Sequence, residues 1–152
     1  MHDTNAFRLL TLYLAVGLCC LVAGSVVAET VTLEELDDRV KVAVDGEPFT
    51  EYLFDCFGRP VLYPVIGPHG IAMTRHFPVK TDVPGEAHDH PHHTSIWFTH
   101  SPVNGVNFFA VGPEMGKCVH EKVLSIESGG PRGVLRTAAQ WVAPDGRAVL
   151  SD

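Results

Sequence analysis

Turn-forming residues recur about every ten positions from residue 40 onward, and this spacing constrains the fold more than any other feature. Short apolar runs lie between the turns. Asp45-Gly46, for example, is a typical two-residue hairpin turn between a run at 40–44 and another at 49–54. Because short strands at this spacing are characteristic of antiparallel sheets, the sequence predicts an all-β fold, an antiparallel β-sandwich.

Residues 32–36 are the one short helix candidate in this region. The last expected strand, at 148–150, forms a hairpin with a partner around Trp141 and then has little chain left. Since sheets tolerate unpaired edges poorly, we expect an incomplete, N-terminal portion of a larger supersandwich-like domain, truncated at its C-terminal side. Further strands are expected at residues 61–66, 94–99, 106–111, 119–127 and 134–142.

The first 28 residues have the pattern of a secretory signal peptide. An apolar run at 9–22 is followed by small residues, with Val26 and Ala28 at the two positions that signal peptidase reads. We expect cleavage after Ala28, a single β-rich domain over 29–152, and export to the periplasm or the extracellular space. An uncleaved membrane anchor is the alternative.

Two cysteines, Cys56 and Cys118, remain in the expected mature chain. In an exported protein they can form a disulfide, or they can be separate thiols, and the sequence leaves both possibilities open.

The charge of the chain argues against nucleic acid as a partner. The chain has 11 Lys and Arg against 18 Asp and Glu, a formal net charge of -7, and its basic residues do not cluster. Proteins that bind phosphate backbones or anionic membranes usually present a basic patch. We therefore expect no nucleic-acid partner and, after signal cleavage, no membrane partner.

Histidines are concentrated between residues 88 and 100, where five of the nine in the chain lie. In an extended segment, His88, His90 and His92 point to the same side. Three imidazoles on one side can ligate a divalent metal such as zinc, iron or copper, with Glu86 or Asp89 as a fourth ligand or an orienting group. Adventitious metal binding, or a hydrogen-bonded cluster beneath a polar ligand, are the alternatives.

Because imidazole titrates near neutral pH, the same cluster suits acid–base chemistry. His90, His92 and His93 are the candidate catalytic residues, and Asp89 is a candidate to tune one imidazole.

The flanking residues suggest a binding surface for a small molecule or a glycan. Trp97 can stack on a sugar ring, or it can pack in the core. Arg75 can bind a carboxylate or hydroxyls, or it can face water. His100 and Asn107 are further candidate ligand contacts, although a strand end and a turn explain them equally well.

Several of these motifs together resemble a known family. They are Asp89-His90-Pro91-His92-His93 with the following Trp97-Phe98, preceded by Tyr63-Pro64-Val65-Ile66-Gly67-Pro68-His69-Gly70 and Thr74-Arg75, and followed by Asn104-Gly105-Val106-Asn107-Phe108. From about Tyr52 to Trp141 the chain is similar to secreted bacterial proteins labelled methane oxygenase PmoA-like. Family members that have His-His-Arg differ from this chain, which has His92-His93-Thr94.

The resemblance implies a secreted β-sandwich longer than this chain, of a kind found in carbohydrate-rich gene neighbourhoods. Three hypotheses follow: a carbohydrate-directed enzyme that uses the histidines, a metal-dependent oxygenase or hydrolase as the family label implies, and a non-catalytic glycan-binding module.

Overall fold

The computed structural model describes residues 29–152, which form seven β-strands and one short 3-10 turn. The strands make two antiparallel sheets, one of four strands and one of three. The predicted all-β, sandwich-like fold is therefore confirmed. The predicted signal peptide, residues 1–28, lies outside the described residues.

The first sheet has the strand order β1-β2-β3-β4, so each strand pairs with its neighbour in sequence. Between β2 and β3, Asp45 and Gly46 have φ values of 52° and 81°, the conformation that a two-residue hairpin turn requires. The hairpin predicted at Asp45-Gly46 is thus confirmed. The strands are β1 (Val31–Glu35), β2 (Arg39–Val44), β3 (Glu47–Leu53) and β4 (Val61–Val65).

The second sheet has the order β5-β6-β7 and contains the longest strands. The strands predicted at 119–127, 134–142 and 148–150 correspond to β5 (Lys117–Glu127), β6 (Val134–Val142) and β7 (Ala148–Ser151). In β6, Trp141 pairs with Leu150 of β7, as the hairpin pattern predicts.

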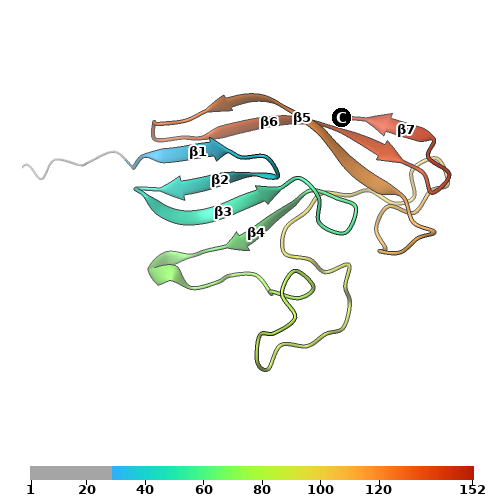
Figure 1. Ribbon diagram of the computed structural model, residues 1–152, viewed down its shortest axis with the longest axis horizontal. Helices are drawn as coiled ribbons and strands as arrows, with labels where there is room; N and C mark the ends of the chain where they lie inside the picture. The colour runs from blue at the N-terminus through green and yellow to red at the C-terminus, as the bar shows by residue number, and fades with distance from the viewer. Residues whose placement is uncertain (1–28) are drawn as a thin grey trace, which may run out of the picture.

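The two sheets lie against each other, one above the other in Figure 1. At one end, Gly133 passes so close to Val31 and Leu33 of β1 that a Cβ atom at this position would collide with both side chains. Further along, the Tyr52 hydroxyl lies 3.3 Å from Oγ1 of Thr137, across the space between the sheets.

The most buried side chains include Val40, Val61 and Trp141, which are at most 1% exposed. Cys56, Val61 and Tyr63 form a buried cluster, against which Leu53, Val79 and Trp97 pack. Both cysteines are free thiols, so the structure contains no disulfide among residues 29–152.

Three local predictions were wrong. Residues 32–35 belong to β1, not to a helix, because each of them pairs with a residue of β2, and Leu36 follows the end of the strand. Residues 94–99 and 106–111 form no strand: they contribute only the isolated bridges Leu62↔Ile96 and Val103↔Val106. These segments contain residues that favour strands, but they form irregular loops because tertiary contacts override the local propensity for β structure.

A long segment between β4 and β5 contains all the candidate site residues. It includes the turn η1 (Pro68–Gly70) and extends away from the sheets on the side of β4, in green to yellow in Figure 1. Within residues 29–152 no helix is long and apolar enough to cross a membrane.

Candidate functional site

A tight turn, and not an extended ribbon, organises the histidines. The amide N–H of His93 donates to the carbonyl of His90 at 2.9 Å, with Pro91 inside the turn. His90 has φ 46°, and Thr94 Oγ1 donates to the carbonyl of Pro91 at 2.7 Å. The expected alternation of His88, His90 and His92 is therefore wrong, since a turn breaks the two-residue period of a strand.

This turn brings three imidazoles together. The rings of His90 and His93 stack with their centroids 5.1 Å apart. His92 lies edge-on to both, 4.4 Å from His93 and 5.7 Å from His90. His88 is not part of this ring cluster, because it stacks on Phe77 at 4.8 Å.

The predicted ligand set His88, His90 and His92 is consequently not assembled as a metal site. Throughout the described part of the chain, no three His, Cys, Asp or Glu side chains are grouped so that they could hold a metal ion. The physical reason is the turn at Pro91, which directs His90 and His92 into one cluster while His88 stays with Phe77.

An open cavity of about 580 Å³ lies beside the imidazole cluster. Its walls combine aromatic rings, hydroxyls and basic side chains, as sites for polar organic ligands often do. Among the aromatic residues, Phe98 is 73% exposed and Phe109 is 43% exposed, so their rings are free for a ligand. The cavity is lined by Thr74, Arg75, His92, His93, Ser95, Trp97, Phe98, Thr99 and Phe109.

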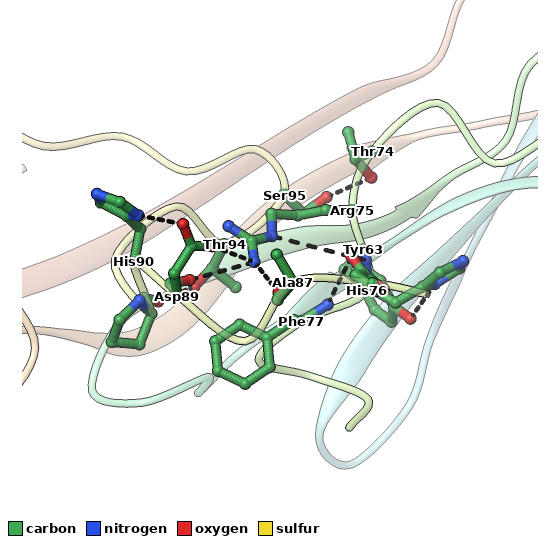
Figure 2. Close-up of polar contacts among 12 residues, drawn as sticks. Tyr63, Thr74, Arg75, His76, Phe77, Ala87, Asp89, His90, Thr94 and Ser95 are labelled. Carbon is green, nitrogen blue, oxygen red and sulfur yellow. Dashed lines mark hydrogen bonds and ion pairs between the residues drawn. The ribbon is translucent and has the colours of Figure 1, made fainter. Parts of the chain in front are cut away.

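Arg75 connects the histidine turn to the preceding segment (Figure 2). Its Nη2 donates to the carbonyls of Ala87 and Asp89, at 2.5 and 3.2 Å, and lies 3.4 Å from Oδ1 of Asp89. The other carboxylate oxygen of Asp89 accepts a hydrogen bond from Nδ1 of His90 at 2.7 Å. The hydrogen bond from His90 is the main reason why the pKa of Asp89 is lowered, with Arg75 contributing.

Glu86 anchors the same loop from the other side. Its Oε1 accepts hydrogen bonds from the backbone N–H groups of His76 at 2.6 Å and Phe77 at 3.1 Å. Burial opposes ionisation of Glu86, but the two N–H donors, together with the electrostatic attraction of His76 and Arg75, lower the pKa of the carboxyl. The His76 ring in turn lies 2.7 Å from the hydroxyl of the buried Tyr63 in β4, which ties the loop to the core.

Trp97 lies between the cavity and the core. Its indole N–H donates to the carbonyl of His92 at 3.1 Å, and one ring face is covered by the Arg59 guanidinium, 3.9 Å from the ring centroid. Its ring centroid is 5.7 Å from that of Phe109. Trp97 therefore packs against the core cluster, one of its two predicted roles, and it also lines the cavity. Its stacking on a sugar ring stays a prediction.

The structure separates the predicted site residues into two groups. Arg75, His92, His93 and Trp97 line the cavity, whereas the exposed His90 and Asp89 lie outside the lining and reach it only through the stack of His90 on His93. His100 is exposed and does not line the cavity.

Asn107 acts within a turn. Its side-chain oxygen accepts hydrogen bonds from Ser101 Oγ and from the N–H groups of Phe109 and Ala110, so it positions Phe109.

Sequence reasoning missed Arg59 and the aromatic residues Phe98 and Phe109. Arg59 lies within the turn expected at residues 57–60, and nothing in its neighbourhood indicates a site. Phe98 was visible as the aromatic neighbour of Trp97, but neighbouring residues in an expected strand point to opposite faces. Because the segment is irregular, the rings of Trp97 and Phe98 both reach the same cavity.

The electrostatic environment favours a neutral His92. Desolvation, the neighbouring imidazoles of His93 and His90, and the charge of Arg59 all lower its pKa. At neutral pH the His92 imidazole is therefore uncharged, and this form can accept a proton.

A family model, described as Family of unknown function (DUF6807), matches residues 39–152. The chain belongs to this family. The matched region of the DUF6807 model covers β2 to β7 and the whole loop that carries the cavity. No curated protein and no solved structure matches the chain. The resemblance to PmoA-like proteins stays a prediction.

Proposed function

We propose that this DUF6807 protein binds a carbohydrate-type ligand in the cavity beside the histidine turn and performs acid–base chemistry on it. The observation that carries the proposal is the lining of the cavity: two imidazoles, His92 and His93, face the same space as Trp97 and Phe109. Aromatic rings suit the apolar faces of sugars, and imidazoles suit proton transfer to and from hydroxyls.

In this proposal His92 is the proton acceptor, because its surroundings favour the neutral imidazole. His93, 4.4 Å away between ring centroids, is the proton donor or a second hydrogen-bonding group. The ionised Asp89 accepts from Nδ1 of His90, which fixes the His90 tautomer and leaves its ring stacked on His93. Asp89 and His90 are therefore positioning residues, behind the groups that meet the ligand.

The hydroxyls of Thr74, Ser95 and Thr99 add hydrogen-bonding groups to the wall. Ser95 Oγ donates to the carbonyl of Leu62 at 2.6 Å and lies 2.8 Å from Thr74 Oγ1. Because the single Ser95 proton goes to the Leu62 carbonyl, the Thr74 hydroxyl donates its own proton to Ser95, and its remaining lone pair can accept a hydrogen bond from a ligand. Such a combination of hydroxyls and aromatic rings recognises polyols better than purely apolar molecules.

The experiment is a glycan panel in which binding and product formation are both measured with the purified protein. We expect binding and turnover, with the acid limb of the pH profile below the ordinary histidine value of about 6.5 because the pKa of His92 is lowered. His92→Gln should abolish turnover and retain binding.

The matched control is His69→Asn, since His69 is exposed in η1 and lies outside this cavity. Binding without any product would replace the enzyme with a glycan-binding module. Full turnover in the His92→Gln, His93→Gln double variant would overturn the proposed chemistry.

Export is part of the proposal. The apolar run at 9–22 and the small residues before Glu29 support it. N-terminal sequencing of the protein recovered from its native host should give a chain that begins at Glu29, and recovery of the uncut chain would contradict cleavage.

A further inference from the structure

All ionisable side chains that line the cavity are basic. They are Arg75, His92 and His93, and no Asp or Glu of residues 29–152 belongs to the lining. This contrasts with the whole chain, in which 18 acidic residues outnumber 11 Lys and Arg. Arg75 is the one permanent cation of this wall, although Glu86 and Asp89 lie near it, and the two imidazoles can offer N–H donors. A wall of N–H donors without a carboxylate suits a ligand with a negative charge.

Arg59 adds a second positive charge directly behind this wall. The residue is 5% exposed, and it forms no ion pair with a carboxylate within residues 29–152. Its guanidinium is held by the carbonyls of Phe109 and Ala110, at 3.1 and 2.9 Å, and by the Trp97 ring. Because buried charges are usually paired, an uncompensated guanidinium favours an anion nearby. Trp97 and Phe109, which both contact Arg59, line the cavity.

Arg75 offers free donors to that anion. Its Nη2 and Nε face Ala87, Asp89 and Glu86, whereas Nη1 makes no hydrogen bond within the described residues. In Figure 2 no dashed line reaches this third nitrogen. A guanidinium with unused N–H groups in a cavity wall suits a carboxylate or a sulfate.

We infer that the ligand is an acidic sugar whose anionic group binds Arg75, His92 and His93 while its ring packs on the aromatic wall. This inference rests on the proposed carbohydrate binding. The shared chemistry is a sugar with an anionic substituent, either the carboxylate of a uronic acid or a sulfate ester.

The test uses the full purified protein and a glycan array of matched probes: uronic-acid oligosaccharides, their methyl esters, sulfated oligosaccharides and the corresponding neutral oligosaccharides. We expect the acidic members to bind at least about tenfold more tightly than their neutral counterparts, as one charge-assisted hydrogen bond supplies. The preference should shrink in about 0.5 M NaCl, since salt screens such contacts. The uronic-acid and sulfated arms identify the source of the anion.

Equal binding of acidic and neutral glycans would overturn this inference and leave the proposed function intact. No binding to any member of the array would overturn the proposed function, and the inference with it.

The variant test compares Arg75→Gln with Arg75→Lys. We expect Arg75→Gln to lose about tenfold of the preference for acidic over neutral glycans, and Arg75→Lys to keep part of it. Arg147→Gln is the matched control, because Arg147 is exposed in the turn before β7. Circular dichroism and thermal unfolding check that each variant folds. If Arg75→Gln does not fold, the comparison of uronic acids with their methyl esters on the unaltered protein decides the question.

Discussion

The guanidinium carbon of Arg59 lies 3.9 Å from the centroid of the Trp97 ring and covers one face of it. The same guanidinium donates to the carbonyls of Phe109 and Ala110, so it joins three separate segments of the chain. Burial lowers the pKa of Arg59, which nevertheless remains protonated near neutral pH. This contact sets the position of two aromatic rings in the cavity wall.

Replacing Arg59 should therefore weaken both the fold and the site. In Arg59→Met the two carbonyls lose their donors, and we expect the free energy of unfolding to fall by about 2 kcal/mol. Arg59→Lys should recover little of the lost stability. An ammonium has no planar face, so it cannot stack flat on the indole while it also donates to the two carbonyls. Urea unfolding followed by tryptophan fluorescence measures the change.

Arg147→Met serves as the control for that series, since Arg147 is exposed. An unchanged or increased stability of Arg59→Met would mean that the cost of burying this charge exceeds the gain from its contacts.

The close approach of the two sheets predicts a contrast between two glycines. An added Cβ at Gly133 would collide with Leu33 and Val31, whereas one at Gly130 would meet no atom of residues 29–152 within 4 Å. We expect Gly133→Ala to destabilise the protein by about 1–3 kcal/mol, as overpacking does. Gly130→Ala should have little effect. Thermal unfolding of the two variants is the measurement, and equal stabilities would contradict the sheet packing.

His120 predicts how stability depends on pH. Its ring stacks on Phe54, with centroids 4.1 Å apart, and its buried Nδ1 has no hydrogen-bond partner in the described part of the chain. Burial lowers its pKa, so the unfolded chain binds the proton more readily than the folded one. Stability is therefore greatest above the unfolded value of about 6.5 and falls as the pH drops towards the folded value.

In His120→Phe that part of the acid sensitivity should disappear, and the free energy of unfolding should stay equal or rise by about 1 kcal/mol, because an unpaired polar atom is removed. Urea unfolding across a pH series measures both effects. The remaining slope is expected from His92, whose pKa is lowered as well. An unaltered pH dependence in His120→Phe would rule out this assignment.

The hydrogen bonds of Glu86 lead to a prediction about local unfolding of the segment between β4 and β5. In Glu86→Gln the ionised acceptor for the N–H groups of His76 and Phe77 becomes neutral, and the attraction to Arg75 is lost. We expect proteolytic cleavage between β4 and β5 to become several-fold faster, while the two sheets persist. Limited proteolysis with mass spectrometry locates the cuts. Glu114→Gln, an exposed position in the same segment, is the control and should resemble the unaltered protein.

Local patterns in the sequence were sufficient for most strands. The alternation in 40–44 and the Asp45-Gly46 turn define one hairpin, and the runs at 119–127 and 134–142 define another. These features depend on neighbours in sequence, so they can be interpreted without a structure. The helix prediction at 32–36 was wrong because acidic residues after a leucine resemble a helix start. The conformation of this segment is decided by its pairing with β2.

For the candidate site, local sequence patterns indicated only that histidines, an arginine and aromatic residues gather in one long loop. Tertiary structure decided which of them share a cavity. The turn at Pro91 separates His88 from His90 and His92, and the core contact of Arg59 brings Trp97 and Phe109 together. Such contacts join residues that are distant along the chain, and no local periodicity encodes them because each depends on how an irregular loop packs against the sheets.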